Sequence, residues 1–326
     1  MPDEGEIQAL IEEGRECLDA GEYDRAIAIG EQLEQYRHSY AFELMALAYA
    51  AKDDLPAAIK VLERGVSLAP AVWLLWQLLG NYYSDMARYL DAREAYAHAL
   101  ECPTVDPSSV YYNSALLSLR EGKFSEALLE LDKVSGSKLA WKAASRRISI
   151  YADMGNVNEA ISYAEQILRE VAAVNEEEMD EDQAADVAGL YGEYANAVWR
   201  HGDAQQALAL AWQAVSWWKQ EETSLWLIRE IEGMHSSHAR YHHLIIEGVW
   251  SELFDGEDST SGFFVTYGVV ADTPDEAFSL AVRFEPADVR ETLRLDECDV
   301  SPEISDVPKG VYEISDYFCF PAEDAD

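Results

Sequence analysis

Two cations stand four residues apart in this strongly acidic sequence, at Lys142 and Arg146. The chain has 24 Lys and Arg residues against 62 Asp and Glu residues, so a basic strip is unexpected on composition. Residues four apart lie on one face of a helix. Lys and Arg form charge-assisted hydrogen bonds with carboxylates, and neighbouring Asn donors can fix the carboxylate's orientation. The pair therefore predicts a contact with a carboxylate-bearing ligand.

Motifs that would indicate catalysis are missing from the sequence. It has no phosphate loop, no G-x-S-x-G, no H-E-x-x-H and no dinucleotide fingerprint. Pairs of carboxylates are so frequent among 62 acidic residues that they identify no site. We therefore expect a protein that is not an enzyme, with no catalytic residue and no cofactor.

Four of the seven histidines fall within nine residues, at His235, His238, His242 and His243. A zinc site needs its ligands to converge in a tetrahedron. His242 and His243 are consecutive on a predicted strand, so their side chains should point to opposite faces. We expect a junction between domains here and no metal site.

The net charge of −38 restricts the partners. It repels the phosphates of nucleic acids and the surface of anionic membranes. We expect a protein or peptide partner, and the net charge favours a basic protein. Solubility or a high-salt habitat would also account for the acidity.

The first residues, MPDEGEIQAL, are acidic where a secretory signal would be basic. The longest apolar run, 71–80, is too short to span a bilayer. The four cysteines are scattered without a C-x-x-C pair. Together these features predict a cytoplasmic protein with reduced thiols.

An alanine recurs six times along the chain at steps of 32, 34, 35, 33 and 47 residues. These alanines are Ala26, Ala58, Ala92, Ala127, Ala160 and Ala207. Five positions before each stands a small or helix-stopping residue, in order Gly21, Asp53, Ala87, Gly122, Gly155 and Gly202. A period near 34 residues with this internal order indicates stacked helical hairpins. The glycines can take the left-handed conformation that ends a first helix.

The clearest repeat begins at Trp73 and reads WLLWQLLGNYYSDMARYLDAREAYAHAL. Its W-x2-L-G-x2-Y motif and the second helix that follows comprise Trp76, Leu79, Gly80, Tyr83, Ala92, Tyr96 and Ala99. This repeat resembles the tetratricopeptide repeat. The resemblance implies a mostly α superhelix of about six hairpins, whose first helices line a concave groove that binds a partner.

The resemblance places six polar residues, called here the groove residues, on first helices: Gln77, Asn81, Asn113, Arg120, Lys142 and Arg146. Apart from Arg120, the set is similar to the carboxylate clamp of co-chaperones that bind acidic tails of heat-shock chaperones. That clamp has Lys and Asn four apart, Asn one repeat later, and Lys and Arg four apart on the third repeat. The resemblance implies a partner with an acidic C-terminal tail. Gln77 stands where the clamp has lysine, which removes one charge.

We predict a repeat domain over 1–235 and a small α+β domain over 236–326. The hairpins are expected at 6–38, 39–70, 73–102, 108–136, 141–172 and 186–220, with a capping helix over 221–234. The acidic insertion at 175–183 is interpreted as a solvated turn or helix extension. The tryptophans Trp212, Trp217, Trp218 and Trp226 are expected to pack against the cap and the C-terminal domain.

Beyond residue 234 the helical period gives way to β-branched and aromatic residues. Strands are predicted over 242–250, 262–271, 293–300 and 310–320. One helix is predicted within 273–284, with Thr273 as its N-cap and Pro274 at its first position. The order of elements predicts an antiparallel sheet with one helix.

The sequence thus predicts a non-catalytic adaptor that binds a peptide or protein in the groove. One alternative is an acidic inhibitor or immunity-type protein that covers a basic enzyme such as a nuclease. A second alternative is a ligand-binding or enzymatic role of the C-terminal domain. The acidic end, 322–326, could also occupy the groove.

Overall fold

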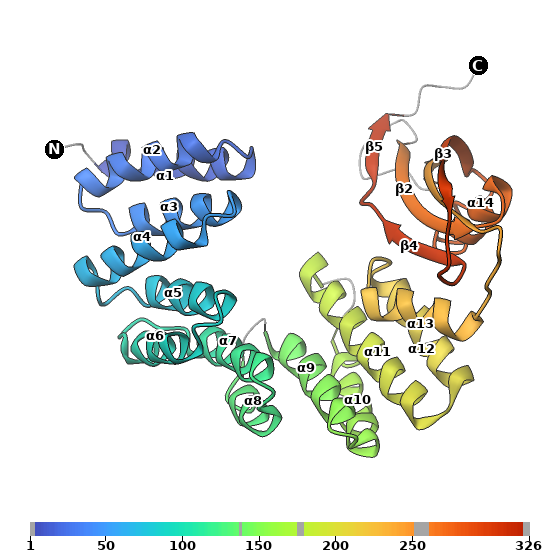
Figure 1. Ribbon diagram of the computed structural model, residues 1–326, viewed down its shortest axis with the longest axis horizontal. Coiled ribbons are helices and arrows are strands. Elements are labelled where there is room, and N and C mark those ends of the chain that lie inside the picture. The colour runs from blue at the N-terminus through green and yellow to red at the C-terminus, as the bar shows by residue number, and fades with distance from the viewer. Residues whose placement is uncertain (1–3, 137–138, 175–178, 251–260, 322–326) are drawn as a thin grey trace. The chain divides into compact units, whose positions relative to one another are not determined.

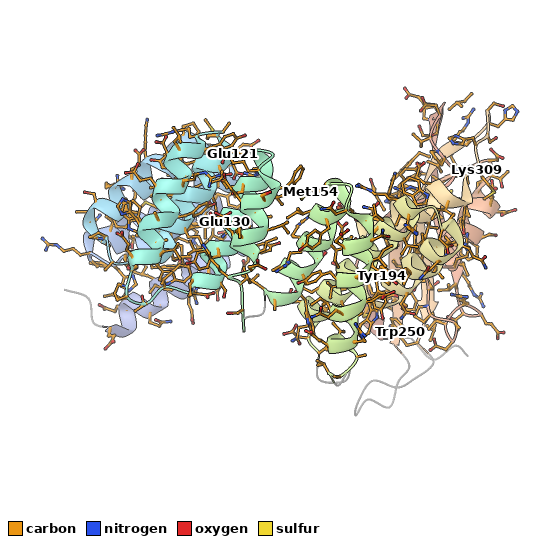
Figure 2. All side chains as sticks on the ribbon, turned by 90° about the horizontal axis from the view of Figure 1, so that it is seen from below. Glu121, Glu130, Met154, Tyr194, Trp250 and Lys309 are labelled. Carbon is orange, nitrogen blue, oxygen red and sulfur yellow. The ribbon has the colours of Figure 1, made fainter. Side chains whose placement is uncertain are left out.

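The computed structural model describes residues 4–136, 139–174, 179–250 and 261–321. These residues form two compact units, 1–140 and 141–326 (Figure 1). Figure 2 draws their side chains, with Glu121 and Glu130 labelled on the first unit and Tyr194, Trp250 and Lys309 on the second. The boundary predicted at 235/236 falls where helices give way to strands, inside the second unit.

Unit 1 consists of helices that pack in consecutive pairs (Figure 1). They are α1 (Glu4–Asp19), α2 (Tyr23–Gln35), α3 (Tyr40–Ala51), α4 (Leu55–Leu68), α5 (Trp73–Asp85), α6 (Tyr89–Glu101), α7 (Pro107–Arg120) and α8 (Phe124–Leu131). The predicted stack of helical hairpins is confirmed in this unit. Pro70 follows the end of α4, as expected for a residue that cannot continue a helix.

The turn between the two helices of each hairpin contains one residue in the left-handed conformation. Glycine fills this position in four hairpins, with φ of 72° at Gly21, 72° at Gly122, 79° at Gly155 and 103° at Gly202. Asp53 and Ala87 take φ of 64° and 56° at the same position. The geometry is therefore kept in all six hairpins, although an L-residue with a side chain adopts it at a cost.

The recurring alanines lie where the two helices of a hairpin cross. All six are fully buried. Gly80 serves the same close approach from the first helix, because a Cβ built on it would lie 2.5 Å from the ring of Tyr96. Small residues at both positions let the helices pack at short distance.

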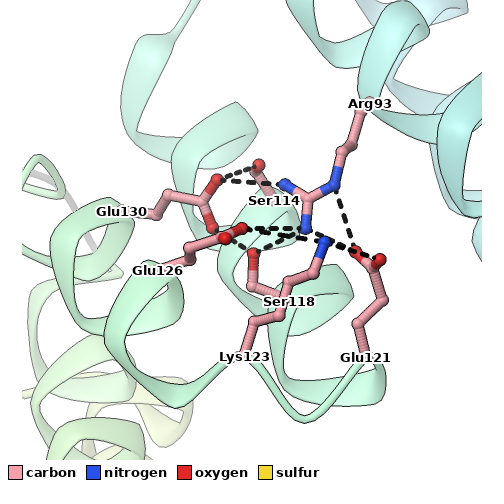
Figure 3. A network of polar contacts seen from close by, with 7 residues as sticks. All are labelled: Arg93, Ser114, Ser118, Glu121, Lys123, Glu126 and Glu130. Carbon is pink, nitrogen blue, oxygen red and sulfur yellow. Dashed lines mark hydrogen bonds and ion pairs between the residues drawn. The ribbon is translucent and has the colours of Figure 1, made fainter.

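An ion network joins α6, α7 and α8 (Figure 3). Arg93 donates from Nε to Oε2 of Glu121 at 3.0 Å and lies 3.3 Å from Oε2 of Glu126. Ser118 donates to Oε2 of Glu130 at 2.8 Å. Hydrogen bonds from Lys123 and Arg93 lower the pKa of the Glu121 carboxyl. The network therefore links two consecutive hairpins through charge.

Unit 2 begins with the last helices of the helical array: α9 (Ala140–Asp153), α10 (Val157–Val171), α11 (Glu181–His201), α12 (Ala204–Trp217) and α13 (Glu222–Glu232). Part of the predicted acidic insertion, 175–178, lies outside the described residues. Its last residues extend α11, because the Asp180 side chain accepts from the Gln183 N–H and the Gln183 side chain accepts from the Asp180 N–H. The predicted capping helix is α13.

The rest of unit 2 is an antiparallel sheet with one helix. Its elements are β1 (Arg240–Val249), β2 (Ser261–Ala271), α14 (Pro274–Val282), β3 (Arg294–Ile304), β4 (Gly310–Ile314) and β5 (Phe318–Pro321). The strand order is β3-β1-β2-β4, and β5 also pairs with β2. Thr273 caps α14 by accepting from the Glu276 N–H at 3.2 Å, as predicted.

The strand predicted over 310–320 is two strands. Both pair with β2, so the interruption at 315–317 is a local break along one edge. At the break the Thr266 N–H donates to the hydroxyl of Ser315 at 2.9 Å, and the Ser315 N–H donates to the Thr266 carbonyl at 3.0 Å. A side-chain acceptor thus replaces a ladder hydrogen bond.

The last repeat helices and the sheet share one hydrophobic core. It holds Val215 of α12, Leu227 of α13, Tyr267 of β2 and Leu280 of α14. The four cysteines are free thiols. In the part of the chain that the structure describes, no helix combines the length and apolar character needed to cross a bilayer.

Candidate functional site

The groove residues fall on both units, and those of unit 1 lie on α5 and α7. Asn81 accepts from the Tyr96 hydroxyl through Oδ1 at 2.7 Å, which leaves its amide N–H groups to act as donors. Gln77 and Asn113 are half-buried, and within the described residues Oε1 of Gln77 has no hydrogen-bond partner. These amides can therefore orient a ligand, but they add no charge.

Arg120 lies at the end of α7 and is already paired within unit 1. Its Nη1 donates to Oδ1 of Asp85 at 2.6 Å and to Oγ of Ser84 at 2.8 Å. The guanidinium is half exposed, so this pair is worth little and its other N–H groups stay open to solvent.

Lys142 and Arg146 belong to unit 2 and lie on α9, both exposed. Nζ of Lys142 is 3.7 Å from Oδ1 of Asp186 on α11. Burial raises the pKa of Glu193, which lies two helical turns after Asp186 on α11, and the positive charge of Arg146 opposes this rise. Ser145, between the two cations, donates to the carbonyl of Gly189 at 3.2 Å and fixes α9 against α11. Lys142 thus has a carboxylate of the next first helix beside it, and Arg146 influences a second one through its charge.

Asp186 is buried and Glu193 is half-buried, whereas the cations are exposed. Asp186 is 6% exposed and Lys142 is 47% exposed. Burial raises the pKa of Asp186 to about 6, and the charge of Lys142 opposes this rise. Burial likewise raises the pKa of the Glu193 carboxyl, whose Oε2 has no hydrogen-bond partner among the described residues. A ligand approaching this face therefore meets the cations first.

A third carboxylate, the half-buried Glu221, continues this face toward α13. It accepts from the N–H groups of Thr223 at 3.1 Å and Ser224 at 2.7 Å, so it caps α13. Burial raises its pKa. Gly192 of α11 allows the contact, since a Cβ there would lie 2.2 Å from a Glu221 oxygen.

Reasoning from sequence missed these three carboxylates because acidic residues are frequent everywhere. One signal was available. Asp186 and Glu193 are seven residues apart, two turns along one helix face, and they lie on the first helix of the hairpin after the one that carries the cation pair. We refer below to Lys142, Arg146, Asp186, Glu193 and Glu221 as the charged face.

The histidines and tryptophans singled out from the sequence are accounted for by their places in the fold. His242 is buried on β1 with Nδ1 at 2.8 Å from the Arg240 carbonyl, while His243 is exposed, so the two point to opposite faces as predicted. Trp212 packs on Phe284 with ring centroids 4.8 Å apart, and Trp226 packs edge-on against Trp199 at 5.0 Å.

The fold was compared with solved structures. PilW, a widely conserved type IV pilus biogenesis factor, matches with a TM-score of 0.50 and 18% identity, over 68% of this chain and 98% of that chain. A tetratricopeptide repeat protein from Parabacteroides merdae ATCC 43184 matches with a TM-score of 0.49 and 15% identity, over 70% of this chain and 84% of that chain. The Cut9–Hcn1 structure matches with a TM-score of 0.48 and 13% identity, over 67% of this chain and 41% of that chain.

No protein-family model matches the sequence, and no curated protein matches it. The likeness to solved structures is at low identity and concerns the fold. The 34-residue period, the left-handed turns and the buried alanines agree with it. The helical array of this chain therefore has the tetratricopeptide-repeat fold.

Proposed function

We propose that this chain is a non-catalytic adaptor that binds an extended segment of a protein partner along its first helices. Lys142 and Arg146 would hold carboxylates of that segment, and Asn81 and Asn113 would hold its polar groups. The observation that carries the proposal is the charged face, in which two exposed cations lie near carboxylates that are buried or half-buried.

The charged face is better explained as a binding site for a ligand than as an ion pair that stabilises the fold. A buried carboxylate is unfavourable unless it is well paired, and Lys142 stands 3.7 Å from Asp186. The α11 carboxylates can hold the long side chains of the cations in place, which lowers the entropy lost when a ligand binds. The outward N–H groups of Lys142 and Arg146 then remain donors for a partner carboxylate.

The experiment is affinity capture from the native cell lysate followed by mass spectrometry. The wild type is compared with Lys142→Glu/Arg146→Glu. The control, Lys60→Glu/Arg169→Glu, makes the same change in net charge at exposed positions on the second helices α4 and α10. A protein captured by the wild type and the control but lost from the groove variant supports the proposal.

Asn113→Ala tests whether the same partner also contacts unit 1. The proposal expects weaker capture of the same protein. Capture that is unchanged by Asn113→Ala would restrict the site to the charged face, and capture unchanged by the double groove variant would overturn the proposal.

The acidic inhibitor is a second candidate, favoured by the net charge of −38. It predicts a basic partner that both charge-reversed variants retain and that salt releases, since long-range attraction is screened by ions. Repeating the capture in high salt therefore separates the two functions.

A further inference from the structure

A cavity of about 730 Å³ lies in unit 2 where the repeat helices meet the sheet domain. Its walls come from the end of α12 and the loop after it, from the segment after α14, and from the connection between β4 and β5. This volume is within the range of small-molecule sites. Neither the groove residues nor the charged face contributes to it.

The walls of the cavity are mainly aromatic. They include Trp212, Trp217, Trp218, Trp250, Phe284 and Tyr317. Tyr317 stands edge-on to Trp250 with centroids 5.0 Å apart, and Phe263 supports both rings from behind. Flat, rigid walls of this kind favour a planar ligand, which gains contact area by stacking.

A buried ion pair is built into one wall. Glu285 is fully buried, and Nζ of Lys219 lies 3.0 Å from its Oε1. The Tyr317 hydroxyl donates to Oε2 of Glu285 at 2.6 Å, and the Tyr267 hydroxyl donates to Oε1. Burial lowers the pKa of the Lys219 ammonium, and Glu285 opposes this change. Three donors therefore hold one carboxylate, which fixes the position of the ammonium at the cavity wall.

The cationic side chains of the cavity keep free donors, beside the carboxylates of Glu181 and Asp316 that also line it. An ammonium has three N–H groups, and Lys219 uses one on Glu285 while it lies 3.5 Å from the centre of the Tyr317 ring. Arg290 donates to the carbonyls of Glu285 at 2.8 Å and Arg283 at 2.9 Å, so part of its guanidinium is left for a ligand.

Two of the aromatic faces that would attract a cationic ligand are already covered. Lys219 lies over Tyr317, and the guanidinium of Arg283 lies 4.7 Å above Trp212. A second cation would meet these charges at short range. Lys219 and Arg283 have carboxylate partners in Glu285 and Glu232. Asp316 accepts from Gln220 at 2.9 Å and adds a weaker attraction to the Lys219 ammonium.

We propose that this cavity binds a small planar organic anion. Its ring system would stack between the tryptophan side chains, and its acid group would accept from Lys219 and Arg290. The proposal is independent of the adaptor function, because the two sites share no residue.

The test is isothermal titration calorimetry of the full chain with two matched probes, 2-naphthoate and the neutral 2-naphthamide. Both present the same ring system, and only the first carries a charge. The expected result is saturable binding of 2-naphthoate at least about 10-fold tighter than binding of 2-naphthamide, which is the size expected for a charge-assisted contact.

The variant Lys219→Met/Glu285→Gln removes the ion pair without leaving a buried charge unpaired. It should narrow the difference between the two affinities, because Arg290 then remains as the cation that holds the acid group. The control Lys309→Met, on a lysine paired with Asp272 and Glu276, should leave the difference unchanged. Equal affinities of the two probes for the wild type, or no binding of either, would overturn the proposal. The comparison of probes on the wild type decides the question even where the double variant fails to fold.

Discussion

Replacing Asp186 by Asn should stabilise the protein near neutral pH, because the carboxylate is buried beside α9 and its ion pair with the exposed Lys142, at 3.7 Å, offsets only part of the cost of burial. Its pKa rises from 3.8 to about 6 on folding. Each pKa unit corresponds to about 1.4 kcal/mol, so the ionised carboxylate costs up to about 3 kcal/mol in the folded state. Lys142 loses its partner in the variant, but this ammonium is half exposed and the pair is worth little. We expect a net gain of about 1 to 2 kcal/mol in the free energy of unfolding.

The dependence on pH identifies the cause of this gain. A group whose pKa is raised on folding binds its proton more tightly in the folded state, so its favourable contribution is complete below pH 3.8 and is lost as the pH rises through about 6. The advantage of Asp186→Asn should therefore shrink by about 1.4 kcal/mol between about pH 7.5 and about pH 5. Comparing variant with wild type removes the contribution of the other 61 acidic residues, since both chains share them.

The assay is urea denaturation of both proteins at each pH, above the isoelectric point of about 4.3. The variant Glu230→Gln, at an exposed position of α13, measures the effect of losing one negative charge elsewhere on unit 2. If the free energy of unfolding differs between Asp186→Asn and the wild type by the same amount at both pH values, the buried carboxylate of Asp186 is not the cause of the difference. A loss of stability at about pH 7.5 would also refute this explanation.

Three further predictions concern the repeats. Gly80→Ala should lower the free energy of unfolding by about 1 to 3 kcal/mol in urea titrations, because the new methyl meets the Tyr96 ring; an unchanged midpoint would show that the ring can move away. Ala87→Gly should raise it by about 0.5 to 1 kcal/mol by relieving the φ of 56°, and a loss of stability would contradict this account of the turn. Arg93→Met should cost about 1 to 3 kcal/mol near neutral pH and less in acid, since the contribution of Glu121, whose pKa is lowered, is lost as the pH falls; equal costs at both pH values would count against the network.

The repeat array could be predicted from the sequence because its determinants are local. The alanine at each helix crossing and the residue in each left-handed turn recur at fixed spacing, so the hairpins and the capping helix were placed correctly. Asp53 and Ala87 show that the position, more than the glycine itself, carries the signal. The break between β4 and β5 depends on one side chain, Ser315, that replaces a backbone partner, and no periodic pattern contains it.

The sites were less accessible from sequence, because they depend on burial and on residues far apart in the chain. Lys142 and Arg146 could be proposed as site residues from their spacing, but the carboxylates near them look like any other acidic residue until their burial is known. The cavity combines residues between Glu181 and Tyr317. The tryptophans were expected from the sequence to pack against neighbouring elements. Only the structure shows that some of them also line a cavity.

The charged face should select peptides with carboxylates, and a selection from a library of random peptides with free C-termini measures this most directly. The account predicts that the wild type and Lys60→Glu/Arg169→Glu enrich peptides containing Asp and Glu, and that Lys142→Glu/Arg146→Glu loses this enrichment. Enrichment of Lys and Arg by all three proteins would contradict the proposed groove and would assign recognition to the net charge of −38.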